Sequence, residues 1–331
     1  MAPPPPQAAR FDPAHQTWEL SRYSEVIAAL HDPRLWPEGA ESEVERGSRV
    51  EPGELRVRPA MLEEFSASRM AAWRSQIEAW AREGAGLLLT DAPVDLLRQL
   101  AQPWCLSLAI LATGADPAAR EQLSELGRHV IAGTGEPEGS SRQARAAEAT
   151  RELERLLENA RVPMAEPTFV GISQTFSRAL AKAWVALVQH PDEWARLRAQ
   201  PDLLPGAMDE LLRYAGIVRS LVRRAVADTE VAGIRIAKGE RVVLMVGSAN
   251  RDPAKFPEPD RLDVTRRVIG QVALGNGRNS CVGALLIRTA GGALTSALVS
   301  RFSGVELCGE VPRQVSSRFA WPQAVHVRLR S

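Results

Sequence analysis

A glycine-rich loop around one cysteine, Leu274-Gly-Asn-Gly-Arg-Asn-Ser-Cys-Val-Gly283, constrains the fold of this chain more than any other segment. Glycines at 275, 277 and 283 let the backbone bend tightly and approach a flat ligand, because they carry no Cβ atom. Cys281 stands where an apolar helix begins, and the N-terminus of a helix favours a thiolate. A turn that holds a buried structural cysteine would explain the loop as well.

Neither phosphate-binding motif fits this loop. It lacks the third glycine of the dinucleotide-binding G-x-G-x-x-G pattern and the Gly-Lys-Ser/Thr of a P-loop. The three cysteines, Cys105, Cys281 and Cys308, are far apart and the five histidines are scattered, so the sequence indicates neither a disulfide framework nor a metal held only by side chains. A single thiolate in such a loop suits a metal whose other ligands belong to a macrocycle.

The charge balance argues against polyanionic partners. The 41 basic and 40 acidic side chains give a net charge of +1, which provides no field to attract nucleic acid or an anionic membrane. No apolar run approaches the length that spans a bilayer, and the first residues lack the basic and apolar regions of a signal peptide. We therefore expect a cytoplasmic protein that binds neither nucleic acid nor membranes.

Apolar spacing predicts a mainly α fold with a small β portion, of the α+β class. Helices are expected over residues 91–114, 142–161, 167–190, 205–214 and 281–302. Short strands are expected over residues 222–246, and a small β hairpin over residues 312–329. We expect residues 1–10 to be a disordered proline-rich tail and residues 11–331 to form a single domain.

The cysteine loop resembles the haem-binding signature of the cytochrome P450 enzymes, F-G-x-G-x-H-x-C-x-G. Leu274 stands in place of the family's Phe, and Asn279 in place of His or Arg. The resemblance implies a cytochrome P450 fold and Cys281 as the proximal iron ligand of haem b. It also implies that the neighbouring loop residues surround the cofactor, namely Leu274, Gly275, Gly277, Asn279 and Gly283.

Two further segments carry the resemblance. Glu210-Leu-Leu-Arg213 resembles the family's Glu-x-x-Arg helix, and its i, i+3 spacing places both charges on one helical face. The same spacing is common in ordinary surface ion pairs. The segment from Ala249-Asn-Arg-Asp-Pro253 to Asp263 resembles the one that precedes the haem loop in bacterial members, and implies that Arg261 joins Glu210 and Arg213 in a buried network.

Two arginines match positions that contact haem propionates in the family. Arg223, ten residues before Gly233, is one of them. Arg58 matches the arginine of the His-x-x-x-Arg helix, although Glu54 occupies the histidine position with the wrong charge for a propionate. A solvated surface arginine is an equally good interpretation of Arg58.

Gly171-Ile-Ser-Gln-Thr-Phe176 resembles the helix that crosses the oxygen-binding face of the haem, A-G-x-D/E-T-T. Thr175 keeps the alcohol, whereas Gln174 replaces the acid and cannot pass on a proton. Ile172 stands where a glycine usually makes room for dioxygen. The alternative for Thr175 is a structural residue that bonds back to a helical carbonyl.

The chain is short for this family, and the missing sequence falls between residues 36 and 65 and between residues 161 and 168. We therefore expect a fold truncated in the regions that cover the substrate. The expected pocket walls are Ile172, Ile217, Val218, Leu221 and Phe319. Arg219 is a candidate anchor for an acidic substrate, or a surface residue.

The resemblance implies a monooxygenase that oxidises a small organic substrate, with Thr175 and Gln174 as candidate catalytic residues. A separate ferredoxin or flavodoxin would supply the electrons. Two alternatives remain open at this point. One is a haem-thiolate enzyme that uses peroxide or rearranges an oxidised substrate, which the replacement of the acid by Gln174 favours. The other is a non-catalytic haem-binding accessory protein.

Overall fold

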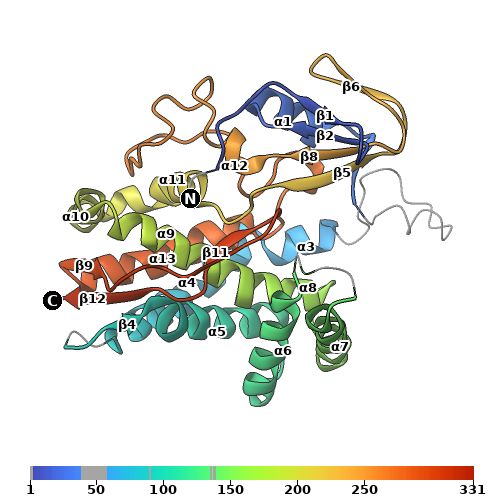
Figure 1. Ribbon diagram of the computed structural model, residues 1–331. Coiled ribbons are helices and arrows are strands. Elements are labelled where there is room, and N and C mark those ends of the chain that lie inside the picture. The colour runs from blue at the N-terminus through green and yellow to red at the C-terminus, as the bar shows by residue number, and fades with distance from the viewer. Residues whose placement is uncertain (1–2, 39–57, 89–90, 135, 137–138) are drawn as a thin grey trace.

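The computed structural model describes residues 3–38, 58–88, 91–134, 136 and 139–331. Helices supply most of its regular structure, which confirms the predicted mainly α class (Figure 1). The helices are α1 (Tyr23–His31), α3 (Arg58–Glu64), α4 (Ala67–Gly86), α5 (Gln102–Thr113), α6 (Arg120–Ala132), α7 (Ser141–Leu156), α8 (Ala165–Val170), α9 (Ser177–Val188), α10 (Pro191–Ala199), α11 (Leu204–Ala215), α12 (Val246–Ala249) and α13 (Ala284–Arg301).

Two segments are wound as π-helix, η1 (Leu96–Ala101) and η3 (Gly171–Phe176). Each continues directly into a longer α-helix, so that α8, η3 and α9 follow one another without a break. Single-turn π segments occur mostly inside α-helices and often at functional sites. Three short 3₁₀ turns complete the helical part: η2 (Pro117–Ala119), η4 (Pro201–Leu203) and η5 (Gly277–Asn279).

The helix predicted over residues 91–114 starts later than its apolar spacing suggests. Residues Val94 and Asp95 form strand β4, and the Asp95 carboxylate then caps η1 by accepting hydrogen bonds from the amides of Leu97 and Arg98. Gly114 ends α5 with a φ of 73°, which an L side chain rarely adopts. The predicted end of this helix is therefore confirmed, and its start is wrong.

The strands form one larger sheet and three small ones. The larger sheet has the order β1-β2-β8-β5-β3, in which β2 and β8 are parallel. A second sheet has the order β4-β12-β9, and β6-β7 and β10-β11 are antiparallel hairpins. The bounds are β1 (Arg10–Asp12), β2 (Thr17–Leu20), β3 (Leu35–Pro37), β4 (Val94–Asp95), β5 (Leu221–Ala225), β6 (Thr229–Val231), β7 (Ile234–Ile236), β8 (Arg241–Leu244), β9 (Gly304–Leu307), β10 (Arg313–Val315), β11 (Ala320–Pro322) and β12 (His326–Arg330).

The proline-rich start lies against the fold, so the predicted disordered tail is wrong from Pro3 onward. The Gln7 amide donates to Ser21 Oγ at 2.7 Å, and Ser21 Oγ donates back to the Gln7 carbonyl at 3.0 Å. Pro3 lies beside Gly247, where an added Cβ would be 3.1 Å from the proline ring. Proline cannot donate a backbone hydrogen bond, but its ring can still pack against an apolar surface.

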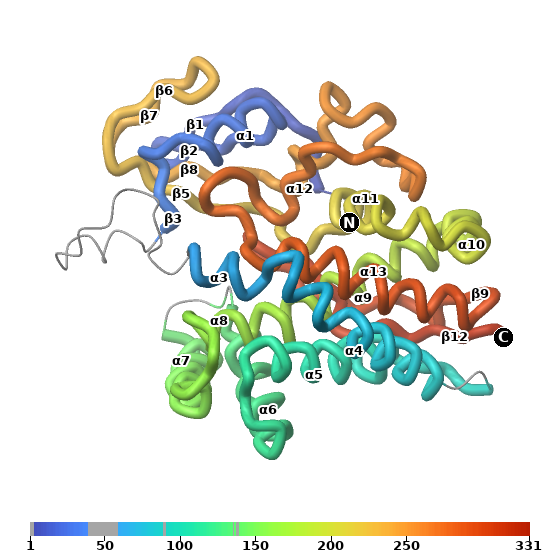
Figure 2. Tube along the Cα trace, turned by 180° about the vertical axis from the view of Figure 1, so that it is seen from behind, coloured from blue at the N-terminus to red at the C-terminus, as the bar shows by residue number. Residues whose placement is uncertain are grey.

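The helical core surrounds α9 and α13, which run through the middle of the molecule in both views (Figures 1 and 2). The two helices meet at Gly291, where an added Cβ would lie 3.4 Å from Phe176 and 3.3 Å from Leu180. The larger sheet has its own apolar cluster, which it shares with α1. In the described part of the chain, no helix combines the length and apolar character needed to cross a membrane.

Candidate functional site

The cysteine loop forms a tight bend directly before α13. Gly275 and Gly277 both have a φ of 72°, which confirms the predicted need for glycine at these two positions. An added Cβ on Gly277 would also lie 3.1 Å from the Leu30 carbonyl oxygen of α1. Gly283 has an ordinary φ of −82°, and its added Cβ would meet only the Cys281 Sγ, at 3.9 Å.

Backbone hydrogen bonds fix the position of Cys281. Its amide donates to the Leu274 carbonyl at 2.8 Å and closes the loop, while its carbonyl accepts from the Ala284 amide at the start of α13. Cys281 is exposed, which argues against a buried structural cysteine at this position. Cys105 is the contrast, because it is fully buried in α5 and burial raises the pKa of its thiol well above the ordinary value.

One face of α11 holds the chain on both sides of the cysteine loop. Asp209 accepts from the Gln271 side chain at 3.1 Å, before the loop, and from Arg288 Nε at 2.9 Å, in α13 after it. The side chain of Asn250, beyond β8, accepts from the Val272 amide at 2.8 Å. Asp209 was not identified from the sequence, although it directly precedes Glu210 on the same helix.

The predicted Glu210–Arg213 pair is present and fully buried. Arg213 Nε and Nη2 donate to the two carboxylate oxygens at 2.6 and 2.9 Å, in a bidentate pair. Arg213 Nη1 also donates to the carbonyls of Asn250 and Pro259, at 2.9 and 2.8 Å. The pair therefore ties α11 to the segment that leads to the cysteine loop.

The prediction that Arg261 is the third charge of this network is wrong. Its side chain is 60% exposed and contacts Glu258 at 3.4 Å, so that it contributes only its carbonyl oxygen, 3.4 Å from Arg213. Arg266 takes the predicted place, because its Nε donates to Glu210 Oε1 at 3.2 Å and its side chain is 15% exposed. The backbone turns after Asp263, where the Arg266 amide donates back to the Asp263 carbonyl, and this turn brings the later arginine inward.

The two arginines make a matched test. We expect Arg266→Ala to lower the free energy of unfolding by about 1 to 3 kcal/mol, because it leaves part of a buried carboxylate without a donor. Arg261→Ala should change it by less than about 0.5 kcal/mol, as exposed pairs contribute little. Urea denaturation followed by circular dichroism measures both. Equal losses in the two variants would contradict the assignment of Arg266.

Arg223 is a buried cation that lacks an acidic partner among the described residues. It is 6% exposed on β5, and the one hydrogen bond of its side chain within the described structure runs from Nη1 to the Val222 carbonyl at 3.1 Å. Burial lowers the pKa of its guanidinium. A buried charge is tolerated when an anion pairs with it, so this position suits the carboxylate of a bound group. The Arg58 side chain and Glu54 lie outside the described residues, although the backbone of α3 begins at Arg58.

Thr175 and Gln174 lie in η3 and differ in their surroundings. The Thr175 hydroxyl makes no hydrogen bond within the described part of the chain, whereas Ser177 bonds back to the Ser173 carbonyl at 2.8 Å. The geometry therefore does not support the alternative in which Thr175 is a structural residue that bonds back to a helical carbonyl. Gln174 is 3% exposed and lies against Gly127 of α6, where an added Cβ would be 3.2 Å from its Nε2.

Gln174 also lines a cleft of about 820 Å³ whose charged residues are all arginines: Arg98, Arg120, Arg128 and Arg178. Arg178 Nη1 donates to the Gln174 carbonyl at 2.8 Å and to Gln174 Oε1 at 3.0 Å. Burial lowers the pKa of Arg178 to about 10. Arg178 was not identified from the sequence, although it follows Gln174 by four residues and so shares its helical face.

Three of the predicted pocket residues lie together. Ile217, Val218 and Phe319 form one apolar cluster with Ile131 of α6, Ala179 of α9 and Trp321 of β11. Val218 and Phe319 are also paired by an isolated β-bridge. The remaining two lie elsewhere, since Ile172 is buried in the helical core and Leu221 packs in the cluster of the larger sheet.

These residues fit a haem. Cys281 is exposed on a glycine bend, and Arg223 offers a buried positive charge that has no acidic partner among the residues described. Such a loop and charge are what a planar, metal-containing macrocycle with acidic substituents requires. The apolar cluster around Ile217 includes Ala179, which follows Thr175 by four residues in the continuous helix.

Comparison with known sequences points to one family. A family model described as Cytochrome P450 matches residues 189–323. The 20-oxo-5-O-mycaminosyltylactone 23-monooxygenase of Streptomyces fradiae is 30% identical over 315 residues, which are 82% of this chain and 73% of that protein. Cytochrome P450 CYP199A2 of Rhodopseudomonas palustris is 36% identical over 155 residues, which are 47% of this chain and 38% of that protein.

Comparison with solved structures gives the same fold. The ligand-free crystal structure of CYP164A2 from Mycobacterium smegmatis superposes with a TM-score of 0.86, and the match covers 97% of this chain and 93% of that chain. At 19% sequence identity, this similarity concerns the fold alone. It confirms the fold that the cysteine loop predicted.

Proposed function

The chain belongs to the cytochrome P450 family, and we propose that it is a haem-thiolate monooxygenase that holds haem b and oxidises a small organic substrate. The observation that carries this proposal is the exposed Cys281 on its glycine bend, together with the buried Arg223 that lacks an acidic partner among the described residues. Haem bound through a thiolate supplies the means to cleave dioxygen and to insert one oxygen atom into a C–H bond.

The residues of this chain would hold and orient the cofactor. Cys281 would bind the iron, while Gly275 and Gly277 leave the backbone close to the macrocycle. Arg223 would pair with a propionate, which would neutralise its buried charge. Arg58 remains a second propionate candidate from the sequence, and Leu274 and Asn279 would line the proximal side.

On the distal side, Thr175 would donate a hydrogen bond from a hydroxyl that has no partner in the described structure. Gln174 can hold a water molecule but cannot deliver a proton. A peroxide-using reaction is a second candidate, which the replacement of the acid by Gln174 favours. Peroxide already carries the electrons and protons that dioxygen must otherwise receive.

The substrate would lie against Ile217, Val218 and Phe319, whose apolar surface favours an organic molecule with little charge at its reacting end. Electrons would come from a separate ferredoxin or flavodoxin. A cytoplasmic location also remains a prediction from the sequence.

Isotopically labelled dioxygen tests the proposed reaction. With reductant and a ferredoxin, a monooxygenase places one labelled atom in the product and the other in water. Product that forms only with peroxide, and carries no label from dioxygen, would favour the second candidate. The binding of a substrate can be followed beforehand by the change that it causes in the absorption of the haem.

Gln174→Glu tests the role of the missing acid. The new carboxylate would lie beside Arg178, whose charge would keep its pKa low, and it could exchange protons with water in the arginine-lined cleft. We expect reductant-supported turnover to rise by about tenfold, a modest gain for general acid catalysis. Gln174→Met is the matched control, because it keeps the length of the side chain and removes its polarity. A rise in both variants would contradict a role in proton delivery.

A further inference from the structure

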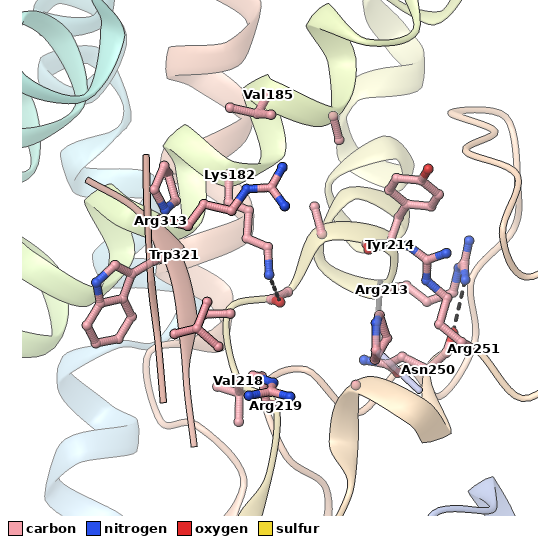
Figure 3. A pocket seen from close by; sticks show the side chains of 18 of the residues that line it. Lys182, Val185, Arg213, Tyr214, Val218, Arg219, Asn250, Arg251, Arg313 and Trp321 are labelled. Atoms are coloured by element: carbon pink, nitrogen blue, oxygen red, sulfur yellow. Dashed lines mark hydrogen bonds between the residues drawn. The ribbon is translucent and has the colours of Figure 1, made fainter. Parts of the chain in front are cut away.

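A second pocket, of about 470 Å³, lies at the other end of the helix that carries Thr175 (Figure 3). Its wall combines α9, the end of α11, the turn after α12 and the β10-β11 hairpin. Lys182 comes seven residues after Thr175, which places it on the same helical face about 10 Å further along the axis. Val218 and Trp321 of the apolar cluster around Ile217 also line this pocket.

The charges around this pocket are unbalanced. Its lining includes Lys182, Arg219, Arg251 and Arg313 together with one acid, Asp260. The acid is used by Arg251, to which it is paired at 2.5 Å. Lys182 donates only to the Gly216 carbonyl, at 2.9 Å, and Arg313 has no hydrogen bond or ion pair within the described residues. At least two positive charges therefore face the pocket without an anion.

Two observations show that Lys182 and Arg251 are held where solvent compensates their charges poorly. Burial, together with Arg313, Arg251 and Arg219, lowers the pKa of Lys182 to about 8. The buried Nε of Arg251 has no hydrogen-bond partner in the described structure. An unpartnered buried donor is costly, and a bound acceptor would satisfy it.

Apolar side chains form much of the remaining wall, beside Gln189, Tyr214 and Asn250. Val185 of α9, Val218 and the Trp321 ring lie along it, opposite Arg213 and Arg251 in Figure 3. Small-molecule sites combine such walls with a few convergent polar groups, and their volumes begin at about 300 Å³. A ligand that fits therefore carries an anionic head and an apolar body.

We propose that this pocket is a binding site for a small organic acid, whose anionic head lies between Lys182 and Arg313 and whose body packs on Val218 and Trp321. The head is a carboxylate or a phosphate ester, since both are anions that accept hydrogen bonds from ammonium and guanidinium groups. The site does not depend on the haem or on the proposed oxidation. Its ligand would also support the hairpin that contributes Phe319 and Trp321 to the apolar cluster.

Titration calorimetry at pH 7 with the full-length holoprotein tests the proposal. The probes are 3-phenylpropionate, phenyl phosphate, the uncharged 3-phenylpropionamide and inorganic phosphate. We expect saturable binding of one or both organic acids with a dissociation constant of about 1 mM or lower, and at least tenfold weaker binding of the amide and of inorganic phosphate. The tighter of the two organic acids identifies the head group. Equal affinity for the amide, or failure of both acids to bind, overturns the proposal.

Single substitutions locate the binding. Lys182→Met and Arg313→Met should each weaken binding of the tighter acid by tenfold or more. Arg235→Met is the matched control, because Arg235 is exposed on the β6-β7 hairpin and does not line the pocket. Lys182→Met removes a charge from a partly buried site and Arg313 is exposed, so neither change should endanger folding. Unweakened binding in both variants would place the ligand elsewhere, including the haem pocket, and overturns the assignment.

The same titration at pH 9.5 tests the role of Lys182 independently. The charged or titratable groups that share the pocket with Lys182 are Arg213, Tyr214, Arg219, Arg251, Asp260 and Arg313. A pKa of about 8 means that Lys182 is largely charged at pH 7 and neutral at pH 9.5. The dissociation constant should rise about tenfold in the wild type and much less in Lys182→Met. Equal pH dependence in the two proteins would contradict the role of Lys182.

Discussion

Replacing Cys281 with serine is expected to abolish the thiolate-type Soret band of the dithionite-reduced protein in the presence of carbon monoxide. The band would report a thiolate ligand of the haem iron, and a serine hydroxyl cannot take the place of this ligand. We also expect loss of at least about 99% of oxygenation, since the electron donation that favours O–O cleavage is removed. Absorption spectroscopy and a turnover assay with reductant and dioxygen measure the two effects.

The other cysteines provide the controls. Cys308 is partly buried beyond β9, and Cys105 is buried in α5, so neither is exposed as Cys281 is. Cys308→Ser should leave the thiolate-type band unchanged. If the band survived in Cys281→Ser, the iron would have another ligand, and the proposed function would lose its main support.

Breaking the buried Glu210–Arg213 pair should cause the largest loss of stability among these predictions. In Glu210→Gln or in Arg213→Met, the unchanged residue of the pair stays at a site where solvent reaches neither side chain. Removing one partner of a buried ion pair costs about 3 to 5 kcal/mol, because the remaining buried charge loses its main partner. Chemical denaturation should show this decrease in the free energy of unfolding, and haem should be lost at lower denaturant concentrations.

A double variant separates charge pairing from packing. Glu210→Leu with Arg213→Met removes both charges and should lose less stability than the two single changes added together. The cost that remains would come from Arg266, which then loses its carboxylate partner, and from the Asn250 and Pro259 carbonyls, which lose their donor. Strict additivity would mean that the pair contributes no coupling, against what its bidentate geometry indicates.

Local patterns in the sequence predicted most of the helices and the cysteine bend. The bend at Gly275 and Gly277 could be predicted because a positive φ leaves few alternatives to glycine. The helix α13 could be predicted from its long apolar stretch. The π-helical winding of η3 could not be predicted from the sequence, because the same residues also satisfy the spacing of an ordinary α-helix. The order of the larger sheet could not be predicted either, since it depends on pairing between distant segments.

The candidate site was predictable where a motif fixes the geometry. Glu210 and Arg213 are three residues apart on one helix, so their pairing follows from the helical spacing. Arg261 and Arg266 lie in an irregular segment, and only the turn after Asp263 decides which guanidinium reaches Glu210. The pocket around Lys182 could not be predicted for a related reason, because Lys182, Arg219, Arg251 and Arg313 come from separate parts of the chain.

The parallel pairing of β2 with β8 has a consequence for the synthesis of the protein. Trp18 on β2 donates a hydrogen bond from its indole to Glu240, 222 residues later in the chain. During translation, the β1-β2 hairpin therefore cannot pair with β8 until β8 has left the ribosome. A nascent chain stalled before residue 240 should expose this early hairpin to proteases and chaperones, and one stalled well past residue 245 should protect it.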